Sequence, residues 1–372
     1  MIDELRTKIA NYTDIFVFGR GSMGQAFFQM LSTLYPGKLI RYCDSNAPPG
    51  APPDATLLRP DEAAARYADA LFCIGSVVHS KAMVGQLAAL GIPEANILLT
   101  PQCVMQEDKR RKLIPRTALG GFEYHLTEHC NLKCAGCLHF SNIAEEEFAD
   151  IDVFIRDINR LKEILGSGLT AIRLCGGEPL LHPAIEDFIE GARKLLPKAQ
   201  VTLVTNGVLL MSMPDSFWSL MKRCGVSISM TEYPVGIDIA GIRRKAVEFG
   251  VQFATTVFSK NWNKHIFDLS GRLDPVESFV NCPRANGICV RLCKGRLYPC
   301  TIVGNAEHFN RKFNQNLLHK DEDSLDIYAD ITKEDIYDFL AKPVSFCRYC
   351  DVTKLRAHEW MLSRHQIDEY LP

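Results

Sequence analysis

Three cysteines occur within eight residues, at Cys130, Cys134 and Cys137. Thiolates are the protein ligands of iron–sulfur clusters and of many structural zinc sites. Three of them at this spacing can surround a compact inorganic core and leave one iron of a [4Fe–4S] cluster open to another ligand. A zinc site would need a fourth ligand, and three nearby histidines could provide it: His125, His129 and His139. The spacing alone therefore leaves both kinds of site open.

A glycine-rich motif, Gly176-Gly177-Glu178-Pro179, directly follows a predicted strand downstream of the cysteine loop. Two glycines let a ligand approach the end of a strand closely. Glu178 adds a carboxylate that suits a ligand's ammonium group. Taken alone, the motif is more typical of a tight turn, so its meaning depends on the cysteine loop that precedes it.

The pairing of a CxxxCxxC loop with a Gly-Gly-Glu-Pro strand end resembles the radical S-adenosylmethionine (SAM) superfamily, over about residues 120–260. Thr205-Asn206-Gly207, after the next strand, resembles it too. The resemblance implies that the three cysteines hold a [4Fe–4S] cluster whose open iron binds SAM. It also implies that SAM lies against the glycine-rich motif and Asn206. Ser227 or Ser229 could contact SAM from the following strand, or could simply face a helix.

The chemistry implied by this resemblance is reductive cleavage of SAM to methionine and a 5′-deoxyadenosyl radical, which removes a hydrogen atom from a substrate. The cofactor supplies that chemistry, and the protein positions it and excludes water. One departure concerns Gly136, which stands where the superfamily commonly has an aromatic residue near adenine. Either His139-Phe140 supplies that contact or the adenine pocket differs.

A second group of six cysteines lies near the C-terminus: Cys282, Cys289, Cys293, Cys300, Cys347 and Cys350. Its order resembles the twitch subdomain, a shortened form of the SPASM domain that holds an auxiliary [4Fe–4S] cluster. The resemblance assigns four ligands, namely Cys282, Cys300, Cys347 and Cys350. Gly295 fits the turn of a hairpin that bends around such a cluster. Cys289 is a rival ligand, Cys293 is spare, and a four-cysteine zinc knuckle is the alternative.

A third motif, Gly19-x-Gly21-x-x-Gly24, follows a predicted strand and opens a predicted helix, and Asp44 ends the next strand. This is the context of a dinucleotide-binding fingerprint. Its glycines let backbone amides approach a pyrophosphate, and the carboxylate accepts a hydrogen bond from a ribose hydroxyl. NAD or another nucleotide is therefore a candidate ligand. The alternatives are a sugar nucleotide, a loop that binds nothing stably, and a docking domain.

Several segments resemble a bacterial radical SAM group often found beside glycosyltransferase and polysaccharide functions: residues 129–134, 137–141, 295–300 and 308–310. The layout with one auxiliary cluster also resembles an aminocyclitol dehydrogenase. In that type of enzyme a base takes the proton of a substrate hydroxyl, and the auxiliary cluster accepts an electron. Because an imidazole titrates near neutral pH, three histidines are candidate bases: His139, His182 and His308.

The elements that must position these motifs form two series of alternating strands and helices. In the first series, strands are predicted at 15–18, 39–43, 70–74 and 97–99, with helices after the glycine loop and at 81–90. In the second, strands are predicted at 122–126, 171–174, 201–204, 226–229 and 251–255, with helices between them, including 152–165 with Gly166 at its end. Residues 106–116 read as a linker, and 333–340 as a late helix. We therefore expect an α/β chain with a Rossmann-like, doubly wound domain (1–115), a partial (β/α)6 barrel (116–278) and an iron–sulfur cap (279–372).

The composition narrows the class of protein. The chain has 372 residues, and 42 basic against 44 acidic residues give a net charge of −2, so no global attraction to nucleic acid or anionic membrane is expected. It has no run of 18 apolar residues and begins without a signal-peptide pattern, so we expect a cytoplasmic location. Fourteen cysteines in a reducing compartment indicate metal binding or redox chemistry. Five isolated cysteines are expected to be buried packing residues: Cys43, Cys73, Cys103, Cys175 and Cys224.

These observations predict a radical SAM enzyme that oxidises or rearranges a small polyol, sugar or nucleotide-sugar. Its partners would be that substrate and an electron donor such as flavodoxin or ferredoxin. One alternative is a peptide-modifying radical SAM maturase. Another is a non-catalytic sensor that holds iron or zinc, for which no cleavage of SAM is expected.

Overall fold

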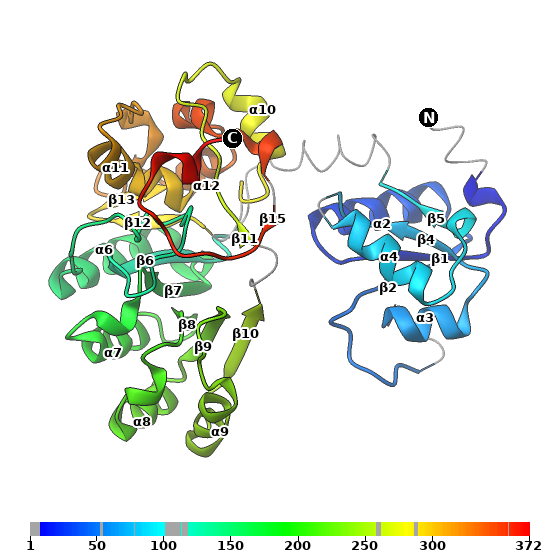
Figure 1. Cartoon of the computed structure of the whole chain (residues 1–372), viewed down its shortest axis with the longest axis horizontal. Helices are drawn as coiled ribbons and strands as arrows, with labels where there is room; N and C mark the ends of the chain where they lie inside the picture. The colour runs from blue at the N-terminus through cyan, green and yellow to red at the C-terminus, as the bar shows by residue number, and fades with distance from the viewer. Residues whose placement is uncertain are drawn as a thin grey trace. The chain divides into compact units, whose positions relative to one another are not determined.

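The structure, a computed structural model, describes residues 8–52, 55–77, 79–100, 113, 118–257, 262–285, 289–355 and 357–372. It divides into two compact units, Met1–Arg111 and Lys112–Pro372 (Figure 1). The second unit contains both the predicted barrel and the predicted cap. Cys103 and the predicted linker are outside the described residues, apart from Leu113.

The first unit is a parallel sheet with the strand order β3-β2-β1-β4-β5. Its strands are β1 (Asp14–Phe18), β2 (Leu39–Cys43), β3 (Leu57–Leu58), β4 (Leu71–Ile74) and β5 (Ile97–Leu98). Its helices are α2 (Ser22–Leu34), α3 (Pro60–Arg66) and α4 (Ser80–Ala89). This strand order is that of doubly wound nucleotide-binding folds. The predicted strands and helices are confirmed, and β3 and α3 are elements that the sequence did not reveal.

The alternation of side chains along β1 explains why this sheet is covered on both faces. Ile15 and Val17 pack with Phe27 and Leu31 of α2. Phe16 and Phe18 pack on the opposite face with residues of α3 and α4. A strand buried on both faces reads as a continuous apolar run, which is the pattern that predicted β1.

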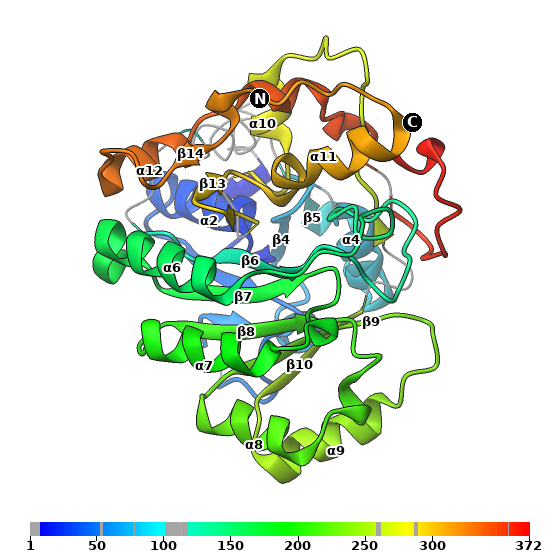
Figure 2. The same ribbon diagram turned by 90° about the vertical axis from the view of Figure 1, so that its left-hand side faces the viewer.

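The second unit is built on five parallel strands that follow one another in chain order (Figure 2). They are β6 (Phe122–Thr127), β7 (Ala171–Gly176), β8 (Gln200–Thr205), β9 (Ser227–Glu232) and β10 (Phe253–Val257). The helices between them are α6 (Ile151–Leu165), α7 (Ile185–Leu195), α8 (Asp215–Arg223) and α9 (Ile239–Phe249). One large apolar core joins these helices to one face of the sheet. A parallel sheet without reversal of strand order, covered by helices on one face, is a partial barrel.

The sixth parallel strand, β12 (Arg291–Cys293), pairs with β6 and not with β10. It continues through a hairpin into β13 (Arg296–Tyr298), and β14 (Leu325–Asp326) completes the sheet. The hairpin turn is Lys294-Gly295, and both residues have positive φ, 47° and 77°. Two consecutive positive φ values are the geometry of a type I′ turn, so the predicted hairpin at Gly295 is confirmed.

The remaining residues form a cap with its own apolar core, which includes Phe140, Phe267, Phe309 and Tyr370. Helices α10 (Pro275–Asn281) and α11 (Thr301–Phe313) lie in this part of the chain, and β11 (Trp262–Asn263) pairs with β15 (Ala357–His358). Helix α12 (Lys333–Leu340) packs its buried residues into the large core of the barrel instead. The predicted helix α12 is confirmed. Helix α11 was not predicted, because the glycine and asparagines in it are weak helix formers. Its contacts with the cap core stabilise it instead.

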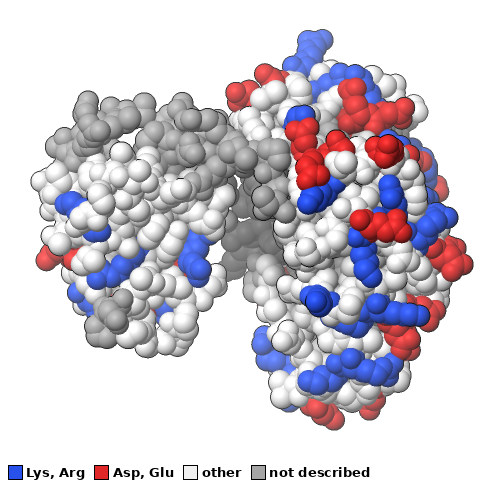
Figure 3. Space-filling view, turned by 180° about the vertical axis from the view of Figure 1, so that it is seen from behind, with Lys and Arg blue, Asp and Glu red and all other residues white. Residues whose placement is uncertain are grey.

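Among the described residues, no helix is both long enough and apolar enough to cross a membrane. Basic and acidic side chains are interspersed over the described face shown in Figure 3. This distribution agrees with the near-zero net charge of the chain.

Candidate active site

The three clustered cysteines lie on the loop that follows β6, at the carboxyl end of the barrel strands. Burial, together with the neighbouring Cys137 and Cys130, raises the pKa of the Cys134 thiol. Burial also raises the pKa of Cys130 to about 12, with Glu178 and Cys137 contributing. The thiols therefore converge at one place. Because burial keeps them protonated, a metal must displace their protons to bind.

Asn206, at the end of β8, anchors the cysteine loop. Its side-chain Nδ2 donates to Asn131 Oδ1 at 2.8 Å and lies 3.5 Å from Cys130 Sγ. Its Oδ1 accepts a hydrogen bond from the backbone N–H of Val208. The structure thus brings Asn206 to the cysteine loop, and its predicted contact with SAM stays a prediction.

The C-terminal tail packs against the other side of this loop. The N–H of Ala135 donates to Met361, and the N–H of Ser363 donates to Lys133. The rings of Trp360 and Tyr233 lie beside Cys134, with their centroids 5.9 Å apart. These two aromatic side chains flank the site, and no motif in the sequence indicated them.

Gly136 and Phe140 explain the departure from the aromatic pattern. A Cβ at Gly136 would lie 2.7 Å from Lys264 Cβ and 3.0 Å from the Glu369 carbonyl oxygen, so a larger side chain does not fit there. Phe140 is fully buried in the cap core, so it does not supply an aromatic contact to the loop. Of the pair His139-Phe140, only His139 therefore stays a candidate for that contact, and a different adenine pocket stays the alternative.

The glycine-rich motif lies directly against the cysteine loop. The N–H of Gly177 donates to Thr127, and that of Glu178 donates to His129. A Cβ at Gly177 would lie 1.9 Å from the His129 carbonyl oxygen. The glycine therefore permits the close approach of the end of β7 to the loop, and Pro179 then begins a short 3-10 turn.

The carboxylate of Glu178 is fully buried and accepts three hydrogen bonds from within the protein. The donors are Thr205 Oγ1 at 2.6 Å, Asn206 N at 2.8 Å and Leu180 N at 3.1 Å. Burial outweighs these donors and raises its pKa to about 7. Glu178 thus braces β8 against the motif. The predicted contact between Glu178 and a ligand's ammonium group stays a prediction.

The serines of β9 face the interior of the barrel. Ile228 and Met230 pack in the core with the helices, so the alternate residues Ser227 and Ser229 lie on the opposite face. Thr202 of β8 hydrogen-bonds Ser227 at 3.0 Å. The alternative that Ser229 faces a helix is therefore excluded, and contact with SAM stays a prediction.

The same alternation makes the interior face of β6 and its neighbours strongly polar. Glu123 and His125 lie on this face of β6, because Phe122 and Tyr124 pack in the helix-side core. Arg173 of β7 forms an ion pair with Glu123 at 3.3 Å. The sequence analysis missed Glu123 and Arg173. The alternating polar and apolar residues at 122–127 were the signal that could have found Glu123.

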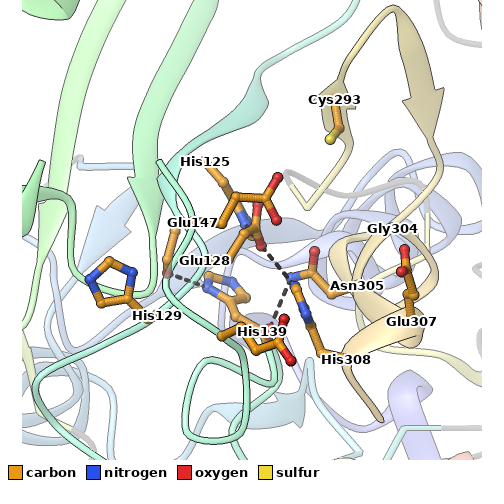
Figure 4. Close-up of polar contacts among 12 residues, drawn as sticks. His125, Glu128, His129, His139, Glu147, Cys293, Gly304, Asn305, Glu307 and His308 are labelled. Carbon is orange, nitrogen blue, oxygen red and sulfur yellow. Dashed lines mark hydrogen bonds and ion pairs between the residues drawn. The ribbon is translucent and has the colours of Figure 1, made fainter. Parts of the chain in front are cut away.

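Glu128 is the centre of a buried network at the junction of β6, β12 and α11 (Figure 4). Its carboxylate pairs with Arg291 at 2.5 Å, with His308 Nε2 at 3.2 Å and with His125 Nδ1 at 3.5 Å. Burial would raise the pKa of Glu128, but Arg291 and the two histidines hold it well below its ordinary value. Burial and Arg291 lower the pKa of His125 to about 3, so its ring is neutral.

The three predicted bases are in different surroundings. His182 donates from Nε2 to Ala149 and accepts at Nδ1 from the N–H of Ala184, so backbone groups occupy both of its ring nitrogens. It lies on the helix side, against Phe188. His139 and His308, in contrast, border the polar interior (Figure 4).

The second cysteine group converges in the cap. Burial and then three thiols, those of Cys347, Cys300 and Cys282, raise the pKa of Cys350. Cys289 lies instead near Glu123 and Cys300, which raise its pKa after burial. This placement favours Cys282 over Cys289 as the fourth member of the group. Cys293 contacts Arg291 outside this group, at 3.6 Å.

Buried polar groups without hydrogen-bond partners surround these four thiols in the described part of the chain. They are Arg284 Nη1, Arg348 Nε and Nη2, and both ring nitrogens of His265. Arg284 and Arg348 are adjacent to Cys282 and to the CxxC pair, and Arg284 influences both His265 and Cys350. Buried N–H groups normally have acceptors, so their surroundings fit a cluster whose sulfides accept hydrogen bonds.

In the first unit the glycine loop has the predicted form. Gly21 directly precedes α2, and a Cβ there would meet nothing within 4 Å. Gly24 packs so closely on the backbone of Gly19 that a Cβ would lie 2.0 Å from the Gly19 carbonyl oxygen. Asp44 Oδ1 accepts from the N–H of Asn46. Binding of NAD or another nucleotide stays a prediction.

The isolated cysteines have the surroundings that the sequence predicted. Cys43, Cys73, Cys175 and Cys224 are buried, as expected of packing residues.

Comparison with known proteins gives a family for the central part of the chain. Residues 124–245 match the family described as the radical SAM superfamily. A GTP 3′,8-cyclase of Clostridium perfringens (strain SM101 / Type A) is 36% identical over 88 residues, which are 23% of this chain and 26% of that protein. Molybdenum cofactor biosynthesis protein 1 of Dictyostelium discoideum is 35% identical over 104 residues, 28% of this chain and 16% of its own length. The chain thus spans about a quarter or less of these relatives.

Among solved structures, BtrN in complex with AdoMet and 2-DOIA is similar at 17% identity, with a TM-score of 0.42 over 64% of this chain and 94% of BtrN. The AdoMet-bound anSMEcpe is similar at 17% identity, with a TM-score of 0.31 over 38% of this chain and 43% of that chain.

Proposed function

Because residues 124–245 form a radical SAM domain, we propose that the protein removes a hydrogen atom from a small polyol, sugar or nucleotide-sugar and so oxidises or rearranges it. One observation carries the proposal. The three thiols of the loop after β6 converge where the glycine-rich end of β7 and Asn206 of β8 meet that loop. The carboxyl ends of parallel barrel strands are where such folds place their chemistry.

The donor set fits a cluster with an open iron. Cys130, Cys134 and Cys137 would hold a [4Fe–4S] cluster, which, when SAM is bound, supplies the electron that generates the 5′-deoxyadenosyl radical. The chain's own groups would do the rest. Asn206 and the backbone at Gly177 fix the loop, and Glu178 braces the strand ends that border SAM.

The polar interior of the barrel supports a hydrophilic substrate. Five charged or hydroxyl side chains come from four different strands and share this face: Glu123, Arg173, Ser227, Ser229 and Arg291. Among these groups, Glu123 Oε2 and Arg291 Nε have no hydrogen-bond partner in the described part of the chain. They favour a polar ligand, such as one rich in hydroxyl or phosphate groups. The position of His182 leaves His139 and His308 as the candidate proton acceptors for a substrate hydroxyl.

The cap supports a second cluster. We propose that Cys282, Cys300, Cys347 and Cys350 hold an auxiliary [4Fe–4S] cluster, which would accept the electron released when the substrate is oxidised. The unpartnered buried N–H groups of Arg284 and Arg348 support a bound metal centre, because metal-bound thiolates or sulfides would accept their hydrogen bonds. An external donor such as flavodoxin or ferredoxin would reduce the first cluster.

The curated relatives add a nucleotide to the substrates worth testing. The GTP 3′,8-cyclase is named for a reaction of GTP, which also carries ribose hydroxyls and phosphates. Its similarity covers 23% of this chain, so the substrate screen should contain GTP beside sugars, polyols and nucleotide-sugars.

The test is anaerobic reconstitution of the full chain with iron and sulfide, followed by Mössbauer spectroscopy with and without SAM. Two [4Fe–4S] clusters, one of them altered by SAM, and formation of 5′-deoxyadenosine with dithionite are the expected results. Cys134→Ala should abolish formation of 5′-deoxyadenosine. Cys224→Ala, a buried cysteine at the end of α8, is the matched control and should retain it. Zinc in place of iron, with no cleavage of SAM, would contradict the proposal and favour a metal-binding sensor.

A peptide-modifying maturase is the remaining alternative for a radical SAM domain with a cap. Product formation from a peptide, with none from any small molecule in the screen, would favour it. Product from a sugar, polyol or nucleotide would exclude it as the main activity.

A further inference from the structure

Three side chains in the barrel interior place potential metal-ligand atoms close together: Glu123, His125 and His139. One atom from each lies within 4.8 Å of the other two. The two imidazole rings are neighbours, with centroids 4.7 Å apart (Figure 4). None of the three belongs to either cysteine group, so a separate role must account for them.

The hydrogen bonds of the two histidines fix which nitrogen is available. His139 Nδ1 donates to the carbonyl oxygen of Gly176 at 2.7 Å. His125 Nδ1 faces the Glu128 carboxylate at 3.5 Å and donates to it. Both rings therefore present the lone pair of Nε2. Histidines that ligate metals typically donate their other N–H to a carboxylate or a backbone carbonyl in this way.

The carboxylate of Glu123 provides the third atom. One oxygen, Oε1, pairs with Arg173, while Oε2 is buried and has no hydrogen-bond partner among the described residues. Oε2 lies 3.9 Å from His139 Nε2. A buried carboxylate oxygen opposite an imidazole lone pair is unfavourable without a positive group between them.

We propose that Glu123, His125 and His139 bind a first-row divalent cation, such as Mn²⁺, Fe²⁺ or Zn²⁺, in the interior of the barrel. Two histidines and one carboxylate form a ligand set that leaves coordination positions open. Bonds of about 2.1 Å at tetrahedral or octahedral angles place neighbouring ligand atoms about 3.0–3.4 Å apart. The ligand atoms lie within 4.8 Å of one another, so the widest separation must close by at most about 1.8 Å for the cation to bind. His125 Nε2 must also exchange the hydroxyl of Thr301, which donates to it at 3.2 Å, for the cation.

The charges around the site indicate what would fill the open positions. Glu123 and Glu128 are each paired with an arginine, Arg173 and Arg291, so the bound cation would carry largely uncompensated positive charge. Such a cation attracts oxygen ligands and lowers the pKa of a hydroxyl that binds it. On the basis of the proposed function, that ligand is a hydroxyl or phosphate oxygen of the substrate. His139 would then be a ligand, and His308 would remain the candidate base.

The test measures Mn²⁺ binding to the full chain with its clusters reconstituted, from the loss of the free-ion signal in electron paramagnetic resonance. We expect Glu123→Gln and His125→Gln to weaken binding at least about tenfold. His308→Gln is the matched control, because His308 also contacts Glu128 but offers no ligand atom to this group. His308→Gln should change the affinity for Mn²⁺ by less than about threefold, whereas loss of a ligand or of its direct hydrogen-bond partner costs about tenfold or more.

A variant that should not weaken Mn²⁺ binding controls for loss of folding. Thr301→Val removes the hydroxyl that competes for His125 Nε2, so it should bind Mn²⁺ as tightly as the wild type or more tightly. Wild-type protein that binds no Mn²⁺ or Zn²⁺, equal binding by the wild type and Glu123→Gln, or weaker binding by Thr301→Val would each overturn the proposal.

Formation of 5′-deoxyadenosine in the same samples separates this inference from the proposed function. If SAM cleavage persists while Mn²⁺ binding is absent from the wild type, the metal site is wrong and the radical SAM function stands. If the wild type binds Mn²⁺ but never cleaves SAM, the radical function is wrong and the metal site stands.

Discussion

The fold brings each cysteine group together, the first from a single loop and the second from segments that are far apart in the sequence. Cys130, Cys134 and Cys137 come from one loop, which the ends of β7 and β8 hold from outside through Gly177 and Asn206. The other group gathers Cys282 from the end of α10, Cys300 from the start of α11 and the two cysteines of the CxxC segment. These cysteines span 68 positions of the sequence, from Cys282 to Cys350. This group depends on the cap core, in which Phe346 and Tyr349 pack beside the CxxC pair.

This difference predicts which group tolerates change. The first group is local in sequence, and each group combines one buried cysteine with partly buried ones. The geometry of the first group depends on a few backbone contacts to neighbouring strand ends. The second group is non-local and is stabilised by many apolar contacts, so single substitutions around it should be absorbed more easily.

Removing one cysteine from each group should separate their roles most strongly. Cys137→Ala should reduce SAM cleavage to the level seen without protein, because the open-iron cluster would lose a ligand. Cys347→Ala should retain SAM cleavage but lose oxidised product, because the electron acceptor is affected instead. The measurement is 5′-deoxyadenosine and product from the same reactions. Equal loss of both in the two variants would contradict the separation of roles.

Two glycines offer the next largest contrast in stability, one against the cysteine loop and one in the hairpin turn before Cys300. Gly177→Ala places a Cβ 1.9 Å from the backbone oxygen of His129, which cannot move without shifting the loop. We expect a loss of about 3 kcal/mol or more in the free energy of unfolding, and loss of bound iron.

Gly295→Ala is the matched change in the hairpin turn before Cys300, where the N–H of Gly295 donates to Asp157 of α6. Its Cβ would meet Tyr328, a side chain that can move, and its φ of 77° should add only about 1–2 kcal/mol of strain. Chemical denaturation with iron analysis measures both glycine variants. A larger loss for Gly295→Ala would contradict the contrast.

The titration of Glu178 makes the stability of the strand ends beside the first cysteine group dependent on pH. Burial raises its pKa from 4.5 to about 7, so the folded chain retains a proton that the unfolded chain releases. Its contribution to stability is complete below pH 4.5 and is lost as the pH rises toward 7, by about 3 kcal/mol in total. Unfolding of the cluster-free chain, followed by tryptophan fluorescence, measures this, because all three tryptophans lie in the second unit.

Glu178→Gln should remove this slope. Glu186→Gln, at an exposed position in the first turn of α7, should leave it unchanged. A slope that persists in Glu178→Gln would show that another group carries the pH dependence.

The sequence predicted the parallel strands well, because apolar runs and regular spacing are local signals. It did not reveal β3, which has two residues, or α11, which is stabilised by Phe309 in the cap core and not by helix propensity. It also could not show that β12 pairs with β6, because that register depends on contacts between distant segments.

The candidate site was predicted to the extent that it is local. The cysteine loop, the glycine-rich motif and Asn206 meet in the structure because each follows a parallel strand, and the ends of such strands lie along one edge. Glu128 and Arg291 escaped detection because 163 positions separate them and only the fold pairs them. Trp360 reaches the cysteine loop from the C-terminal tail for the same reason.

The smallest expected effect tests the fourth ligand of the second group. Cys289 lies beside Glu123 on the barrel interior, whereas Cys282 influences Cys300, Cys347 and Cys350 together. Cys289→Ala should therefore keep the iron content of the wild type and lose only about 1 kcal/mol of stability from the buried sulfur. Cys282→Ala should lose the iron of one cluster. Iron and sulfide analysis of the two variants decides between Cys282 and Cys289. Loss of four irons from Cys289→Ala alone would reverse the assignment and make Cys289 the fourth ligand.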